Sequence, residues 1–337
     1  MNLIDNEGEF ILSGGGLFSR LVHGDQLKSK LMRSRLATLV VIVWLPLLLL
    51  SAMTGQLAPG SVEVAFAYDL EAHLRFLVAL PLLLVAEVIA RKRLRLVFPE
   101  FLQRKLIPDI ATGQFHDAIQ SALRLRKSVV AELFLVAVVY GFGIVVFWRQ
   151  FIALDVSTWY LVPSAGEARF SLAGYWYVLV SLPIFQFVLL RWYFRMFVWA
   201  RFLWQVSQID LRLVPTHPDR RGGLGFLSET VTAFVVLAIA HGVLLAGWLT
   251  VRVVMTDTPL PAFKVEIAAV VVFVLVLVLA PLTVFTAQLR RTKRNGQREY
   301  GTMAMHYVRD FDIKWLRGGV PAGEVFVGNP DIQSLAD

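Results

Sequence analysis

Long apolar runs alternate along this chain with shorter polar segments. Six runs are near the roughly 20 residues with which an α-helix crosses a bilayer. They are Leu36–Thr54, His73–Ala90, Val129–Trp148, Leu172–Leu190, Val231–Val251 and Ile267–Thr286. Each run is continuously apolar, whereas the strands of a membrane β-barrel alternate over about ten residues. The pattern therefore predicts an all-α integral membrane protein with six transmembrane helices and cytoplasmic helical extensions.

The composition supports this class of protein. Of the 337 residues, 57% are hydrophobic and 17% are charged, against about 45–50% and 25% in soluble domains. The first thirty residues contain no apolar segment of the signal-peptide kind, so we expect no cleavable signal. The chain has no cysteine, which excludes disulfides and thiolate-bound zinc.

Positive charge is distributed unevenly between the two ends of the predicted spans. All but five of the 33 Lys and Arg residues lie before the first run or after the second, fourth and sixth. The exceptions are Arg75, Arg149, Arg169, Arg252 and Lys264. By the positive-inside rule both termini are expected in the cytoplasm, in a bacterial cytoplasmic (inner) membrane. Because the net charge of +8 gathers beside apolar runs, we expect anionic lipid headgroups rather than nucleic acid as its partner.

The polar segments divide the chain into parts. We expect a cytoplasmic N-terminal arm (1–35), a six-helix membrane domain (36–290) with a helical insert (91–128) and a loop (202–230), and a cytoplasmic tail (291–337). Within the insert, a helix from about Gln114 is expected to run directly into the third span. The tail is expected to continue as a helix through Trp315 and to end at Gly318.

The fourth run does not end at Leu190. It continues as RWYFRMFVWARFLWQ, in which Arg191 and Arg195 share one helical face. Aromatic rings and arginines favour the headgroup level, so these two arginines are expected to bind lipid headgroups. A helix that reaches into the cytoplasm and binds another anionic ligand is the alternative.

The segment between the fourth and fifth runs, IDLRLVPTHPDRRGGLGFL (209–227), is the richest in chemically useful residues. Its glycines permit positive φ, and Ser228 or Thr230 is expected to cap the fifth helix. Backbone amides and arginines there suit a phosphate or carboxylate. The candidate ligand or effector residues are His217, Asp219, Arg220, Arg221, Gly222, Gly223 and Gly225. A rigid turn, with Asp219 as a cap or ion-pair partner, is the alternative.

No metal or other cofactor is expected. His217 and Asp219 are two possible ligands where a metal site needs three or four.

Polar residues inside the predicted spans are few, and the candidates are His241, Glu87 and Gln186. His241 lies beside small residues in the fifth span, where it either forms a hydrogen bond across a helix contact or titrates. Glu87 precedes Arg91 by four residues, so we expect an ion pair. These few polar groups are not enough to line a hydrophilic pathway through one chain. A pore on the axis of an oligomer is compatible with this pattern.

Three functional classes follow. The first is a homo-oligomeric protein of channel or transport type, with the 209–227 loop as gate or effector site. The second is a membrane scaffold or sensor subunit that binds a partner protein through its cytoplasmic helices. The third is an interfacial enzyme that handles a lipid or phosphate, and the sequence offers it no catalytic residues.

Overall fold

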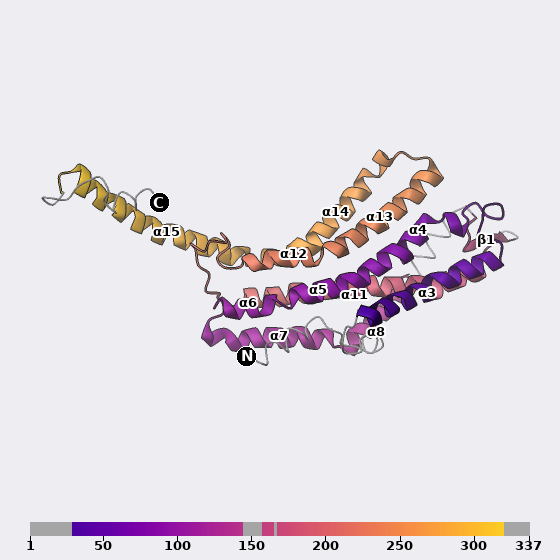
Figure 1. Cartoon of the computed structure of the whole chain (residues 1–337), viewed down its shortest axis with the longest axis horizontal. Coiled ribbons are helices and arrows are strands. Elements are labelled where there is room, and N and C mark those ends of the chain that lie inside the picture. Colours follow the sequence, from indigo (N-terminus) through magenta and orange to yellow (C-terminus); the bar gives the residue numbers. More distant parts are fainter. Residues whose placement is uncertain (1–28, 144–156, 165–166, 320–337) are drawn as a thin grey trace.

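The computed structural model describes residues 29–143, 157–164 and 167–319, and the helices dominate it (Figure 1). Within these described residues, five helical stretches are long and apolar enough to cross a membrane. They are Leu36–Met53, Leu70–Gln103, Leu172–Ser207, Gly225–Val254 and Leu260–Leu316. The predicted third span is described only in its first part, as α8 (Val129–Val138) and a π-helical turn (Val139–Gly143). Its remainder lies outside the described residues, as do most of the N-terminal arm and the end of the tail.

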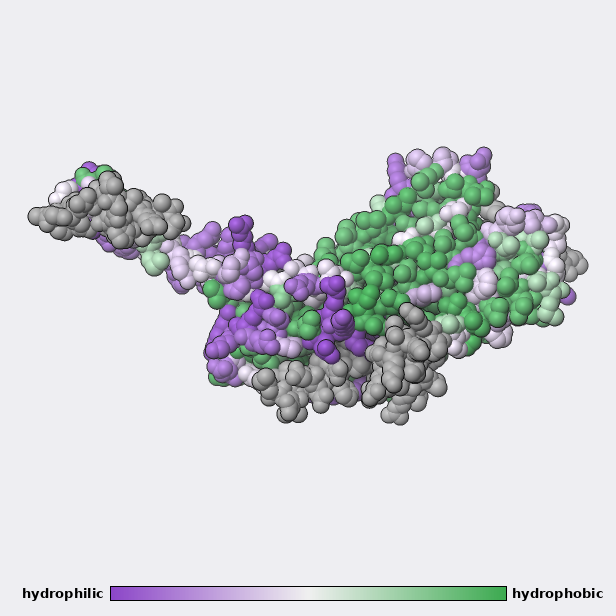
Figure 2. Space-filling model, viewed as in Figure 1, coloured by the Kyte–Doolittle hydropathy of each residue, from purple (hydrophilic) through white to green (hydrophobic). Residues whose placement is uncertain are grey.

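A broad hydrophobic face covers these helices. In Figure 2 it is bounded by hydrophilic residues toward both ends of the bundle. Within α14 (Lys264–Leu279), Val265, Val272 and Val276 are 68%, 57% and 56% exposed. Apolar side chains exposed over such a length would be costly in water. The fold is therefore all-α, with helices that could span a membrane.

The core forms where α3 (Ser29–Met53), α5 (Leu80–Leu94) and α11 (Leu182–Ser207) pack together. The predicted continuation of the fourth helix is confirmed, because α11 is unbroken to Ser207. The Trp192 indole on α11 donates a hydrogen bond of 2.9 Å to the Leu83 carbonyl on α5. We call the end of the bundle where α5 reaches Arg91 the basic end.

At the basic end α6 (Val97–Gln103) continues the direction of α5, and α7 (Thr112–Arg126) then folds back along α11 (Figure 1). The apolar face of α7 is buried, including Phe115, Ala118 and Ala122. The insert therefore packs on other helices rather than lying on a membrane surface. The expectation that this helix runs directly into the third span is wrong. α7 ends at Arg126, and the Ser128 side chain caps α8 by accepting from the Ala131 amide.

The opposite end of the bundle is closed by ordered loops. Strands β1 (Leu161–Ser164) and β2 (Glu167–Phe170) form an antiparallel hairpin that the sequence pattern did not indicate. Next to it, the fully buried Trp159 donates a hydrogen bond of 2.8 Å to Asp69. Asp69 also caps α4 (Leu70–His73) through the Ala72 amide. Two loops distant in sequence are thereby joined.

The fifth helix begins with α12 (Glu229–Ala233) and continues as α13 (Val235–Thr256). The predicted capping by Ser228 or Thr230 is wrong. Both hydroxyls donate to carbonyl oxygens, those of Gly225 and Leu227, instead of accepting from helix amides. The 3-10 turn at Gly225–Ser228 ties these hydroxyls to its own backbone.

The last helices form an arm that leaves the bundle. α14 turns through a 3-10 segment (Ala280–Phe285) that contains Pro281 and then continues as α15 (Thr286–Phe311). A π-helical turn (Asp312–Leu316) ends the helix before Gly318, so the predicted tail helix is confirmed. Figure 1 shows α15 extending away from the other helices.

Candidate functional site

The 209–227 loop folds around the carboxylate of one of its own residues. Asp219 accepts hydrogen bonds from the backbone amides of Arg221 (2.8 Å), Gly223 (3.1 Å) and Gly225 (2.8 Å). The His217 ring nitrogen Nδ1 lies 2.8 Å from the same carboxylate. The backbone donors that we expected to face an anionic ligand therefore already face an internal anion.

This arrangement holds Asp219 in its ionised form. Burial opposes ionisation, but the three amide hydrogen bonds and His217 together lower the pKa of Asp219 to about 2. Positive φ angles at Gly222 (+64°) and Gly223 (+97°) turn the backbone toward the carboxylate. At neutral pH Asp219 is thus a fixed negative centre of the loop, and its oxygens are occupied by hydrogen bonds.

The same loop sets the position of α15. The Gln288 side chain donates to the carbonyls of Ser207 (2.8 Å) and Ile209 (2.6 Å). A Cβ atom at Gly296 would lie 2.3 Å from the Cβ of Pro215, so the loop contacts α15 there and leaves no room for a side chain. The loop and α15 therefore pack directly against each other. The side chains of Arg220 and Arg221 are exposed on the surface of the loop.

His241 is buried in the bundle with both ring nitrogens hydrogen-bonded. Nδ1 lies 2.8 Å from the Leu237 carbonyl, and Nε2 lies 2.9 Å from the Tyr193 hydroxyl of α11. Since a carbonyl only accepts, Nδ1 carries the proton and Nε2 accepts from Tyr193. The side chain forms the interhelical hydrogen bond that we considered. Gln186 is half-buried on α11.

Among the described residues, no atom lies within 4 Å of a Cβ built at Gly242, so this small residue beside His241 does not mark a helix contact there. The packing glycine of α13 is instead Gly247, which lies against Glu71 and Leu74.

A cluster of charged side chains, which we call the arginine cluster, lies at the basic end. Glu87 pairs with Arg91 one turn away on α5 (3.2 Å), as predicted, and with Arg195 on α11 (2.5 Å). The exposed fractions of these three side chains are only 11–15%. The cluster also includes Arg191, one turn before Arg195, and Arg126 from the end of α7.

Arg126 belongs to the cluster because its charge interacts with the other members. The pKa of Arg126 is lowered to about 9. Burial is the largest cause, and the nearby positive charges of Arg195, Arg91 and Arg191 lower it further. The group is still cationic at neutral pH. Four guanidinium groups from three helices therefore share one small region with the Glu87 carboxylate.

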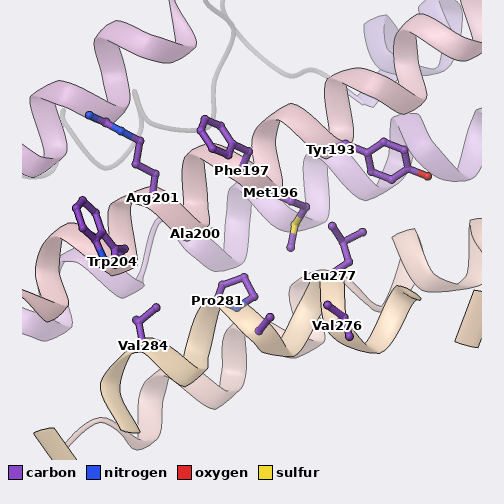
Figure 3. Close-up of a pocket in the computed structure, with 11 residues that line it drawn as sticks. Tyr193, Met196, Phe197, Ala200, Arg201, Trp204, Val276, Leu277, Pro281 and Val284 are labelled. Carbon is purple, nitrogen blue, oxygen red and sulfur yellow. The ribbon is translucent and has the colours of Figure 1, made fainter. Parts of the chain in front are cut away.

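A groove lies where α11 and the start of the C-terminal arm diverge (Figure 3). It is open, has a volume of about 560 Å³, and is lined almost wholly by apolar atoms. The lining residues are Tyr193, Met196, Phe197, Ala200, Arg201, Trp204, Val276, Leu277, Ala280, Pro281 and Val284.

Parts of these sites could be predicted from the sequence. Four-residue spacing indicates the Glu87–Arg91 pair and the common face of Arg191 and Arg195. The contact of Glu87 with Arg195 and the position of Arg126 near them have no local signal in the sequence, so neither was predicted. The Asp-Arg-Arg-Gly-Gly run could have indicated that Asp219 bonds its own loop, since Asp side chains often bind nearby backbone amides.

Within residues 29–143, 157–164 and 167–319, no group of three or more His, Asp or Glu side chains is placed to hold a metal ion. Comparison of the chain with protein-family models, with curated proteins and with solved structures gives no match.

Proposed function

We propose that this chain is one subunit of a homo-oligomeric membrane protein of channel or transport type. In this proposal it has six spans, both termini lie in the cytoplasm of a bacterial inner membrane, and the 209–227 loop is a gate or effector site. The observation that carries the proposal is the exposed apolar stripe of α15.

This stripe is formed by residues three or four apart, which share one face of a helix. Tyr300, Met303 and Tyr307 on it are 42%, 64% and 37% exposed. A helix in a protein gains most of its stability from packing its apolar face against another element. A helix that leaves the membrane with this stripe exposed is therefore expected to have a partner. A second copy of α15 from each neighbouring subunit would supply it around a common axis.

A pathway along the proposed oligomer axis is also compatible with the small number of polar groups in the spans. A pathway formed between subunits does not need a hydrophilic route through one chain. The contact of Pro215 with Gly296 supports a role for the loop in gating, because it couples the loop to the helix that would line the axis.

The test compares two faces of α15. Replacement of Met303 and Tyr307 by Glu is expected to dissociate the oligomer in detergent and to abolish ion flux in liposomes. Met305→Glu is the matched control, since Met305 is 73% exposed and lies off the stripe. An oligomer and flux that survive the double substitution would contradict the proposal.

A scaffold or sensor subunit is the second candidate, and the same stripe favours it if a different protein covers α15. It predicts a stoichiometric co-purifying protein that is lost in the Met303→Glu and Tyr307→Glu variant, together with no flux.

A further inference from the structure

Among the described residues, three helices of the bundle contain a π-helical turn. One lies at Leu74–Ala79 between α4 and α5, and a second lies at Tyr177–Ser181 between α10 (Leu172–Trp176) and α11. The third, at Val139–Gly143, follows α8. A π turn is wider than an α-helical turn, is rare, and often occurs at functional sites. Such turns therefore need stabilising contacts from their surroundings.

Side chains from these turns connect them to one another. The Arg75 guanidinium in the first turn donates a hydrogen bond of 2.5 Å to the Tyr177 hydroxyl in the second. The Tyr140 hydroxyl in the third turn donates to the carbonyl oxygen of Leu179 in the second, at 3.3 Å. The π turns of three helices are thus joined by hydrogen bonds between residues that are far apart in sequence.

Arg75 is the residue that joins the first two turns. Its guanidinium also pairs with Glu71, one turn earlier, and lies 6.0 Å from the centre of the Phe185 ring. Only 17% of the Arg75 side chain is exposed. Tyr177 is buried and stacks on Tyr160, with 5.6 Å between the ring centres. Because a guanidinium presents its donors in a rigid planar fork, binding to Glu71 and Tyr177 at once fixes their relative position.

The same two residues supply the backbone carbonyls of the π hydrogen bonds. The Leu80 amide donates to the Arg75 carbonyl, and the Leu182 amide donates to the Tyr177 carbonyl, each across five residues. In a regular α-helix each amide would donate to the carbonyl four residues earlier. The side-chain contact of Arg75 with Tyr177 therefore acts where both helices depart from α-helical geometry.

We propose that the π turns at Leu74–Ala79 and Tyr177–Ser181 form a hinge, and that the contact of Arg75 with Tyr177 fixes it in one position. When this contact is broken, both turns exchange between π and α geometry. α4 and α10 then move relative to α5 and α11. A change of one residue in register moves a helix by about 1.5 Å along its axis and about 100° around it. The hinge does not depend on the proposed oligomer or on transport.

Distances between pairs of spin labels, measured by electron paramagnetic resonance on the full chain, test the hinge. The chain has no cysteine, so each label is attached only where a cysteine is introduced. One pair, Tyr68→Cys with Leu172→Cys, uses exposed positions next to α4 and α10, on the side of the turns away from the basic end. The second pair, Leu96→Cys with Trp204→Cys, uses exposed positions at the basic end.

Tyr177→Phe removes the hydroxyl that accepts from Arg75 and retains the stacked ring. The distance distribution of the first pair is expected to shift or broaden by at least about 1.5 Å, the rise of one helical residue. The second pair should give the same distribution as in the unsubstituted chain. Tyr175→Phe is the matched control, because it removes a hydroxyl from an exposed ring of α10, and both pairs should be unchanged.

An unchanged distribution of the first pair in Tyr177→Phe would overturn the hinge. Equal changes in both pairs would also overturn it, because they would show a general loss of packing. The same change in Tyr175→Phe would remove the role of the Arg75 contact. Arg75→Gln breaks the contact from the other side and is expected to change the first pair at least as much. If Arg75→Gln does not elute as a single species in gel filtration, Tyr177→Phe decides.

Discussion

The Glu87 carboxylate on α5 lies 2.5 Å from the Arg195 guanidinium on α11. The two residues are far apart in sequence, and both side chains are nearly buried, at 12% and 11% exposure. The pair joins two core helices at the basic end and offsets part of the charge of the arginine cluster. Its removal should therefore affect the whole bundle.

Glu87→Gln is expected to destabilise the protein by about 3–5 kcal/mol, because two guanidinium groups lose a nearly buried carboxylate. Thermal unfolding in detergent measures this change. Glu100→Gln is the matched control. It breaks the ion pair with Arg104, whose partners are 35–36% exposed, and pairs of this kind contribute about 0–1 kcal/mol. Equal effects of the two substitutions would contradict a structural role for the Glu87 pair.

Asp219→Asn is expected to loosen the 209–227 loop at neutral pH, because the fixed negative charge that holds three amides is lost. Hydrogen exchange at Gly223 and Gly225 should become faster. Asp210→Asn, at an exposed position in the same loop, should leave the exchange of these amides unchanged. Protection that persists in Asp219→Asn would show that the carboxylate does not organise the loop.

The unsubstituted loop should also respond to acid. The pKa of Asp219 in the folded chain, about 2, lies below the ordinary value of 3.8. Folding thus favours the ionised form, and the resulting stabilisation is complete above about pH 5 and lost as the pH falls toward about 2. Hydrogen exchange of the loop amides, corrected for the intrinsic effect of pH, should rise across this interval. An exchange profile that is flat below about pH 4 would refute the depressed pKa.

Gly296→Ala is expected to displace α15, because its new methyl group would overlap Pro215. Overpacking of this kind costs about 1–3 kcal/mol. Gly301→Ala is the control on the same helix, where a Cβ meets no atom within 4 Å, and it should stabilise the helix by up to about 1 kcal/mol. Thermal unfolding of both variants gives the comparison. Stabilisation by both substitutions would mean that α15 does not rest on the loop.

The absence of cysteine allows the proposed orientation to be tested without background labelling. Ser228→Cys, at the end of the 209–227 loop, should react with an impermeant maleimide only from the cytoplasmic side. Ser61→Cys, which is exposed near the β1–β2 end, should react only from the other side. Labelling of both residues from one side would refute the proposed topology.

Elements with a continuous local pattern could be predicted from the sequence. The length of α11 follows from an apolar and aromatic run without an internal break, and the helix that ends before Gly318 follows from its terminating glycines. The break at Ser128 was missed because one hydroxyl cap interrupts a pattern that otherwise favours a continuous helix. The β1–β2 hairpin was missed because its strands have four residues each.

The candidate sites depend more strongly on contacts between distant segments. The glycine-rich loop was correctly recognised as a source of backbone donors, but the anion that these donors hold comes from the loop itself. The arginine cluster forms only where α5, α7 and α11 come together in the fold. Four-residue spacing in the sequence predicts only those members that lie on the same helix. Local spacing therefore predicted pairs, while the packing of α7 against α11 produced the cluster.

The mass of the full chain in detergent, measured by native mass spectrometry, is the most direct test of the proposed subunit role. A homo-oligomeric subunit should give an assembly whose mass is a multiple of 37.9 kDa, without any other protein. A species of 37.9 kDa alone, at all protein concentrations and in more than one detergent, would contradict it.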